Sequence, residues 1–554
     1  MSSRLLVSRL SLGPSQIVRG RQRLQYVTLR ARLSTRSTRP NIPFLSPPSS
    51  QQTLARRYAS TRGQWMKHEA KLVVRYMGIF WGIFGCLAVI GFFVNEEVVE
   101  RVYPTPHEWS FLTRKMLRDS HMWIDPTDGL ISWGDAYRRA RITVFRLEDP
   151  NIDGADTVRS EITMNVPQQD SPLEFAPLDV SAKSEEWRRG YFEALTLATK
   201  TAEQVEGWLI DKHRKLVSPP EYVIGPSNPH PKPVPAGVAA ALREEDCELA
   251  YPEPHHYYVK LMATKGFTPR QYMEIMLSWA SYAEYKKDPE TAREFHRIAL
   301  NWATNGQPDS VPNPSRLPYD SNFVLSDKGS PPSFNVLTAL TSLATFTARQ
   351  GDVAAALPMF ISILKARRSL SNEAPPAPRV RRKQYSLFEQ VTNIIAPPDY
   401  PAPPPDGTQP PWRDPEERCQ EAALALHIGE ILFSTSSREE GLAWTREGVD
   451  EAEEQLRKLS PENADTKVTT SCRDCLGMGM ENWAIMAARL AKEEAAQKAK
   501  GPQSSVFGFW STSQDAPDRW AAEELVVKER ARRTKELLEN VRQPQKGFLQ
   551  WFQA

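Results

Sequence analysis

Hydrophobic residues are distributed along the chain in two patterns. One is an unbroken apolar run near the amino terminus, and the other is a helical spacing over much of the remaining sequence. The apolar run extends from Tyr76 to Val94 and contains no charged residue. At ~1.5 Å per residue it reaches about 28 Å, enough to cross the hydrocarbon core of a bilayer. The pattern predicts a single transmembrane helix over 76–94, since a buried core helix seldom runs this long without a polar residue.

The rest of the chain shows helical periodicity interrupted by proline-rich breaks. Tyr103-Pro104 predicts a stop for any helix that continues out of the membrane segment, and helices are expected over about 108–122 and 131–145. The largest break, Ala396 to Pro411, cannot form a helix or a central strand. Strand signals are confined to short pieces such as Ile142 to Phe145. We therefore expect an all-α body with extended insertions.

One predicted helix pair, from Leu340 to about Leu370, resembles the tetratricopeptide (TPR) repeat. In that repeat, helix A ends in a Gly-Asp type turn before helix B, and small residues allow the two helices to cross closely. Five positions carry the resemblance: Leu343 and Ala344 in helix A, Gly351 at the turn, and Ala356 and Phe360 in helix B. This pair is therefore the best candidate for a repeat unit.

Two further pairs fit the same pattern less well. Around 276–302 the small positions are taken by Ala280, Ala292 and Ala299, but His296 occupies the aromatic position. Around 425–450 the small positions include Gly429 and Gly441, whereas Thr445 departs from the pattern. Three to five degenerate repeats predict a broken TPR-like solenoid, although any single unit is also consistent with an ordinary helical hairpin.

Charge adds an organellar signal. No Asp or Glu precedes Glu69, and this stretch is rich in Arg and Ser, which is typical of a mitochondrial transit peptide. Arg56 lies three residues before Ala59, so a cleavage site is predicted between Tyr58 and Ala59. The whole chain carries only three more Lys and Arg than Asp and Glu. Without the leader it is therefore mildly acidic, and nucleic-acid binding is not expected.

The residues flanking the membrane segment predict its direction. Lys67, Lys71 and Arg75 precede it, whereas Glu96, Glu97 and Glu100 follow it. The positive-inside tendency places the amino terminus in the matrix and the body in the intermembrane space. Gly78 and Gly82 form a GxxxG spacing, which is consistent with a helix-pairing face or with ordinary glycines.

These patterns divide the chain into eight predicted regions. They are a presequence (1–58), a basic matrix-side segment (59–75), the transmembrane helix (76–94), a juxtamembrane helical region and loop (95–180), TPR-like repeats (181–371), a Pro-rich insertion (372–411), further TPR-like repeats (412–500) and a charged helical tail (501–554).

Catalytic and metal-binding motifs are not evident in the sequence. Walker, GxGxxG, HExxH and GxSxG motifs are absent, so we predict no catalytic residues, no cofactor and no metal. His255-His256 lacks further ligands at a suitable spacing. Cys472 and Cys475 form one CxxC, which is weak evidence for zinc without a second pair. We interpret these two thiols as helix-packing residues, although oxidation in the intermembrane space is an alternative.

The layout resembles a known family. The presequence, the single membrane helix, the Tyr103 to Trp109 segment (YPTPHEW) and the degenerate repeats are similar to the fungal TPR-type adaptor subunit of the mitochondrial inner-membrane i-AAA protease supercomplex. The resemblance implies a non-enzymatic protein whose single membrane helix contacts membrane lipid and whose body binds unfolded or membrane-protein substrates. It also implies contact with the AAA protease and other supercomplex subunits. Alternatives are a TPR-type assembly factor for a respiratory-chain complex, or an enzyme that uses Cys472 or His255.

Overall fold

The structure is a computed structural model that describes residues 51–125, 131–159, 175–234, 241–306, 317–326, 331–374, 400–459, 466–499 and 519–542. Most of the predicted presequence lies outside these ranges. Tyr58 and Ala59 lie within the first helix, but their side chains are outside the described part. The chain divides into two compact units, one ending at Gly91 and the other beginning at Phe92.

Helix α1 (Gln51–Val102) contains the predicted membrane segment. From Arg62 onward it is long and apolar enough to cross a membrane, and none of its apolar window is buried. This confirms a candidate membrane-spanning helix, although the helix extends beyond 76–94 at both ends. Its end at Val102 agrees with the stop expected from Tyr103-Pro104. A Cβ added to Gly78 or Gly82 would have no heavy atom of the described chain within 4 Å.

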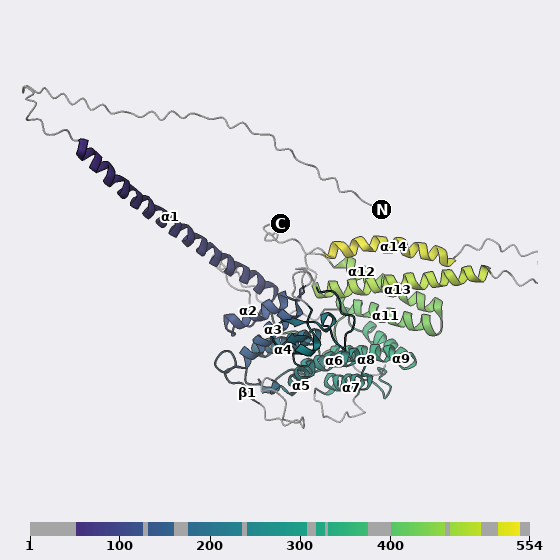
Figure 1. Ribbon diagram of the computed structural model, residues 1–554. Helices are drawn as coiled ribbons and strands as arrows, with labels where there is room; N and C mark the ends of the chain where they lie inside the picture. Colours follow the sequence, from purple (N-terminus) through teal and green to yellow (C-terminus); the bar gives the residue numbers. More distant parts are fainter. Residues whose placement is uncertain are drawn as a thin grey trace, which may run out of the picture. The chain divides into compact units, whose positions relative to one another are not determined.

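The second unit is mostly helical, as expected (Figure 1). Helices α2 (Phe111–Met122) and α3 (Trp133–Glu148) correspond to the two predicted juxtamembrane helices, and the strand-like piece 142–145 lies inside α3. The following helices are α4 (Glu185–Gln204), α5 (Pro254–Ala263), α6 (Pro269–Tyr285), α7 (Pro289–Asn305), α8 (Phe334–Arg349), α9 (Val353–Arg368), α11 (Pro415–Thr435), α12 (Arg438–Lys458), α13 (Thr466–Ala499) and α14 (Arg519–Arg542). The predicted charged tail therefore contains α14.

Short strands modify the expectation of an all-α body. β1 (Val158–Arg159) pairs with β2 (Leu178–Asp179) in antiparallel fashion between α3 and α4. β3 (Leu209–Asp211) pairs with both β4 (Val217–Ser218) and β5 (Cys247–Leu249), so the three-stranded sheet has the order β4-β3-β5. The strands have two or three residues each and lie in the segments that connect helices.

Consecutive helices pack against each other from α2 to α9 and from α11 to α14, and α9 also packs against α11. One buried cluster extends from α2 to α11, and a second joins α11 to α14. Helix α11 contributes to both clusters: Leu424 and Ile428 face the first, whereas Cys419 and Leu426 face the second. A helix that is apolar around its circumference is buried on several sides, so α11 lies between the two cores.

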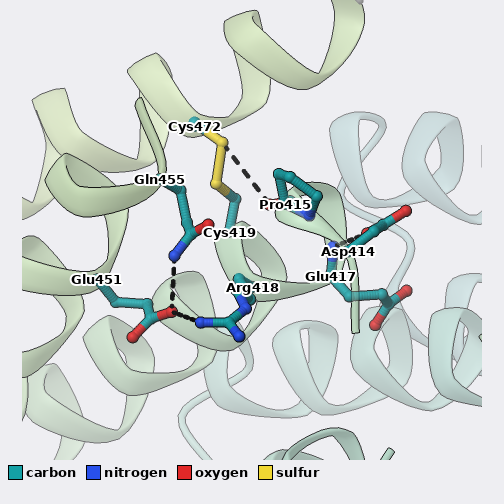
Figure 2. Close-up of a disulfide and its surroundings, with 8 residues drawn as sticks. All are labelled: Asp414, Pro415, Glu417, Arg418, Cys419, Glu451, Gln455 and Cys472. Atoms are coloured by element: carbon teal, nitrogen blue, oxygen red, sulfur yellow. Dashed lines mark hydrogen bonds and ion pairs between the residues drawn. A yellow bond between two sulfur atoms is a disulfide. The ribbon is translucent and has the colours of Figure 1, made fainter. Parts of the chain in front are cut away.

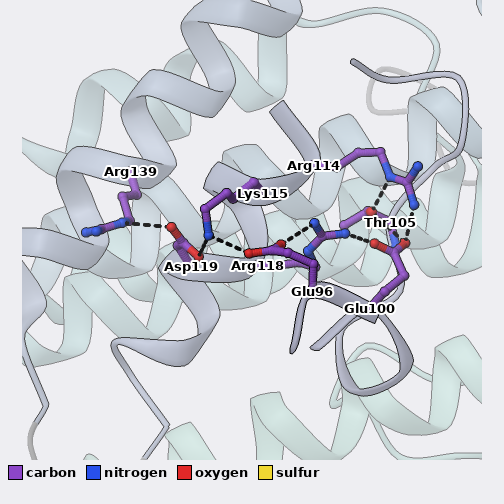
Figure 3. A network of polar contacts seen from close by, with 8 residues as sticks. All are labelled: Glu96, Glu100, Thr105, Arg114, Lys115, Arg118, Asp119 and Arg139. Atoms are coloured by element: carbon purple, nitrogen blue, oxygen red, sulfur yellow. Dashed lines mark hydrogen bonds and ion pairs between the residues drawn. The ribbon is translucent and has the colours of Figure 1, made fainter. Parts of the chain in front are cut away.

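The last turns of α1 are held against α2 by buried charges (Figure 3). Glu96 and Glu100 are 7% and 2% exposed, and Arg118 of α2 is 3% exposed. Glu96 lies 2.8 Å from Arg118 and 2.7 Å from Lys115, while Glu100 pairs with Arg118 and with Arg114. Buried charges need partners, because an isolated one loses its hydration without compensation. Two of the three carboxylates that we treated as an acidic flank are thus neutralised by α2.

The turn after α1 packs against α4. A Cβ at Gly190 would lie 2.6 Å from Pro106 and 2.7 Å from the ring of Trp109, so only glycine allows this approach. Trp109 is 3% exposed. Both Pro106 and Trp109 belong to the 103–109 segment that carries part of the family resemblance. This segment therefore connects the end of α1 to the helices that follow it.

A disulfide joins α11 to α13 through Cys419 and Cys472 (Figure 2). Our interpretation of Cys472 as a packing residue was wrong, because its partner comes from a helix 53 residues earlier in the sequence and not from the CxxC. Cys475 is free and buried, and burial raises the pKa of its thiol to about 12. Near the disulfide, Glu451 of α12 accepts a hydrogen bond from Gln455 at 3.2 Å and lies 3.7 Å from Arg418 of α11.

Candidate polypeptide-binding surface

Helices α6 and α8 each begin a pair of consecutive packed helices, α6 with α7 and α8 with α9, whereas strands β3 to β5 separate α4 from α5. We call α4, α6 and α8 the leading helices. Each begins at a side-chain cap. Ser184 accepts from the backbone N–H of Trp187 at 3.1 Å, and Ser333 accepts from that of Val336 at 3.3 Å. Thr268 and Gln271 form a reciprocal capping box at the start of α6. The caps satisfy backbone donors that a helix start leaves without partners. The leading helices pack against one another, α4 with α6 and α6 with α8.

The predicted repeat positions in α6 to α9 are buried, apart from Gly351 at the turn. Gly351 has a φ of +90° between α8 and α9, a conformation that glycine adopts without strain. The side chains predicted to pack in the helix pairs α6–α7 and α8–α9 are all at most 3% exposed: Ala280, Ala292, Ala299, Leu343, Ala344, Ala356 and Phe360. These small residues allow close approach, and the large ones fill the remaining space.

His296 fills the aromatic position that departs from the repeat pattern. Its ring is 1% exposed and lies 5.0 Å from the ring of Phe346, centroid to centroid. Its Nε2 lies 3.1 Å from a carboxylate oxygen of Glu284. Burial lowers the pKa of this imidazole. Its Nδ1 lies 3.5 Å from the hydroxyl of Ser342, so His296 acts as a packing aromatic with a polar contact at each ring nitrogen.

Gly429 and Gly441 bring α11 and α12 into close contact. A Cβ on Gly429 would lie 2.5 Å from Thr445 Oγ1, and one on Gly441 would lie 2.4 Å from the backbone nitrogen of Phe433. Thr445, which departs from the repeat pattern, is fully buried and donates its hydroxyl to the Gly441 carbonyl at 2.9 Å. The threonine is thus accommodated because its hydroxyl is satisfied within its own helix.

A groove with a volume of about 1020 Å³ lies between the leading helices α4 and α6. Tyr258 and Leu261 of α5 also line it. Its walls combine hydroxyls, charges of both signs and aromatic rings. Thr196, Thr199, Lys200 and Glu203 come from α4, Glu206 follows the end of α4, and Glu274, Ser278, Ser281, Tyr282 and Tyr285 come from α6. Tyr285 is 78% exposed. This mixture suits the polar backbone and varied side chains of a polypeptide.

Two tyrosine–carboxylate pairs cross this groove. Tyr258 donates its hydroxyl to Glu203, and Tyr282 donates to Glu206 at 3.0 Å. Lys286 also pairs with Glu206 at 2.7 Å. Burial raises the pKa of Glu203 and of Tyr258, because the charged form of each loses hydration. The first pair connects α4 to α5, and the second connects the residues that follow α4 to α6.

Neither Tyr258 nor Glu203 was predicted as a site residue. The neighbouring His255-His256 was a weak candidate for a metal pair. Besides the ring of His256, whose centroid is 4.0 Å away, the half-exposed His255 has Glu253 beside it at 3.2 Å. Among the described residues, no three or more His, Cys, Asp or Glu side chains are grouped so as to hold a metal ion. The density of tyrosines in 251–258 was the available signal for the groove.

Comparisons with known proteins do not assign this chain to a family. It matches no family model, and no similar sequence was found among curated proteins.

Proposed function

We propose that this protein is a membrane-anchored adaptor of the mitochondrial inner membrane, which binds unfolded or membrane-protein substrates and presents them to the i-AAA protease. The observation that carries the proposal is the groove between successive leading helices, within a body that follows a candidate membrane helix. The pairs of packed helices are, in this view, degenerate TPR repeats. Repeat proteins of this type bind extended or helical segments on the face formed by neighbouring repeats.

The disulfide supports a location in the intermembrane space. Cys419 and Cys472 are 1% and 0% exposed, so the bond belongs to the interior of the fold. Structural disulfides persist in oxidising compartments and are rare in reducing ones. The orientation now rests on Lys67, Lys71 and Arg75 before the helix, because Glu96 and Glu100 are paired with residues of α2. Acidic residues in any case contribute little to topology.

Within the second unit, the last turns of α1 pack against the helices of the body that carries the groove. Glu96, Glu100 and Arg118 tie the end of α1 to α2, and Trp109 packs against α4, whose other turns line the groove. Anchoring raises the effective concentration of the groove near membrane-bound partners without new contacts. The proposal assigns no catalytic step, cofactor or metal to the chain.

Affinity purification of the full chain from mitochondria in mild detergent tests the partner. We expect the AAA protease to co-purify and its substrates to turn over more slowly when the chain is deleted. Protease protection should show a carboxy-terminal tag that is shielded in intact mitochondria and digested after rupture of the outer membrane. Normal proteolysis together with a missing respiratory complex would instead establish the assembly-factor alternative.

Groove variants test the binding surface. Ser278→Arg and Ser281→Arg place bulky cations on exposed groove positions, and Ala355→Arg places one on an exposed position of α9 outside the groove. The probe is a reduced, carboxymethylated protein that cannot refold. We expect the groove substitutions to weaken its binding about tenfold or more, and the control to leave it unchanged. Equal binding by all three variants would exclude the groove as the substrate site.

A further inference from the structure

A proline-rich segment of the chain lies across the amino-terminal ends of the leading helices. This segment, Tyr400 to Gln409, was predicted as part of an insertion without helix or strand, and the structure shows it without either. Its backbone carbonyls face donors from three helices. Arg189 of α4 donates to the carbonyl of Pro401, and Arg270 of α6 donates to that of Pro405 at 2.6 Å.

The first turn of α8 completes the row of donors. The side-chain amide of Asn335 donates to the Asp406 carbonyl at 2.9 Å, and its backbone N–H donates to the Gly407 carbonyl at 3.0 Å. The N–H of Phe334 donates to Gln409 at 3.1 Å. These backbone donors are ones that a helix start leaves free. The segment therefore caps α8 as well as contacting α4 and α6.

The two arginines lie on the helix faces that line the groove. Arg189 is one and two turns from Phe192 and Thr196, and Arg270 is one and two turns from Glu274 and Leu277. All four of these positions line the groove. Residues three, four and seven apart share one face of a helix. The proline-rich segment thus occupies one end of the surface proposed to bind substrates.

The contacts suit an extended proline-rich chain of any origin. Every hydrogen bond described above goes to a backbone carbonyl, and proline has no N–H that would need a partner. Four residues of polyproline II advance about 12 Å, comparable to the 8–10 Å between packed helices. This matches the spacing of Pro401 and Pro405 on neighbouring helices. The guanidinium of Arg189 also lies 4.2 Å from the ring centroid of Tyr400, a cation–π contact.

Gly407 allows the proline-rich segment to approach Asn335 of α8 closely. Its φ is +68°, and a Cβ there would lie 2.1 Å from Asn335 Oδ1. Any other residue would need both a strained backbone and displacement of Asn335. A substitution at Gly407 therefore disturbs the segment without changing the arginines.

We propose that Arg189, Arg270 and Asn335 form a binding site for an extended, proline-rich segment of a substrate protein, and that residues 400–409 act as a tethered competitor for it. This inference deepens the proposed function by naming the chemistry of the bound segment. A tethered ligand competes at an effective concentration in the millimolar range. A substrate segment must therefore displace the chain's own segment before it can use this end of the surface.

The test uses the full chain in lipid nanodiscs and a fluorescent peptide with the sequence of residues 400–412. In the first variant, residues 400–409 are replaced by a Gly-Ser stretch of equal length. We expect it to bind the peptide about tenfold or more tightly than the native chain, because the competitor is gone. Adding Arg189→Ala and Arg270→Ala should then reduce binding about tenfold. Arg293→Ala, at a half-exposed arginine of α7, is the matched control and should have no effect.

A second variant and a second peptide keep the proposal falsifiable if the linker variant fails to fold. Gly407→Val should increase peptide binding by the otherwise native chain. A peptide with its prolines replaced by alanine should bind more weakly, because it is not preorganised as polyproline II. Equal binding by the native chain and a folded linker variant would overturn the proposal, as would no binding by either. Peptide binding without a co-purifying protease would overturn the adaptor function instead and leave this site in place.

Discussion

The two helical blocks of the body are held together by different interactions. The amino-terminal block, α4 to α9, relies on stacked aromatic rings, such as Trp279 with Phe295 at 4.3 Å and Tyr272 with Trp302 at 4.5 Å. The carboxy-terminal block, α11 to α14, combines glycine-mediated contact, a disulfide and ion pairs such as Arg530 with Glu453.

The difference follows from composition. Helices α12 and α14 are rich in charged residues, so they offer less apolar area to bury than the aromatic helices α6 and α7. Burial of apolar area is the main stabilising contribution in most cores. Where that area is small, close backbone contact and a covalent link compensate. The comparison predicts that the two blocks respond differently to the same kind of perturbation.

The largest expected effect is in the amino-terminal block. Phe346→Ala removes a ring that is 1% exposed and packs against His296, and should cost about 3–5 kcal/mol of unfolding free energy. Phe145→Ala, at a ring that is 63% exposed on α3, is the control and should cost little. Denaturant unfolding followed by circular dichroism measures both. Comparable losses for the two variants would show that the aromatic core does not dominate this block.

Removal of the disulfide should destabilise only the carboxy-terminal block. Cys419→Ser with Cys472→Ser opens a loop spanning 53 residues, and we expect a loss of about 2–4 kcal/mol. A reductant should have the same effect on the native chain. Limited proteolysis with mass spectrometry then locates new cleavage to α11–α14. Cleavage that appears first in α4–α9 would contradict the assignment of the disulfide to a single block.

Close contact between α11 and α12 gives the third prediction. Gly441→Ala should cost about 1–3 kcal/mol, because its Cβ would meet the backbone of Phe433. Gly477→Ala on α13 is the matched control, since a Cβ there would meet no heavy atom of the described chain within 4 Å. That control should be neutral or stabilise by about 0.5–1 kcal/mol through helix propensity. Thermal unfolding distinguishes the pair, and a stabilised Gly441→Ala variant would contradict the close contact.

The smallest expected effect tests the groove by its pH dependence. Burial raises the pKa of Glu203, so its charged form costs stability above the folded-state pKa, and this cost vanishes as pH falls below the unfolded-state pKa. Glu203→Gln should therefore stabilise the chain at pH 7 by less than about 1 kcal/mol, with the gain shrinking toward pH ~4. Glu206→Gln should instead destabilise slightly, because it weakens the pair with Lys286. A gain for Glu203→Gln that grows at low pH would contradict the direction of the shift.

Local patterns in the sequence predicted much of the fold. The candidate membrane helix, its stop near Pro104 and the mostly helical body follow from hydropathy, proline placement and helical periodicity, which act over a few residues. The spacing of small and large residues also placed Gly351 at the turn between α8 and α9, and Ala356 and Phe360 at buried positions. These local patterns did not predict the contacts between segments that are distant in the sequence. Examples are the Glu96–Arg118 pair and the tyrosine–carboxylate pairs of the groove. None of these residues belongs to a recognisable sequence motif.

The sequence by itself determined which segments are helical, which one is apolar enough for a membrane, and which small residues permit close crossings, because these properties depend on neighbours along the chain. Tertiary structure alone decided that Cys472 bonds to Cys419 and not within its CxxC, and that the Pro401–Gln409 stretch lies on Arg189 and Arg270. Both outcomes depend on which helix ends become neighbours in space. Which helix ends become neighbours is set by the packing of the whole body, so it cannot be predicted from a short stretch of sequence.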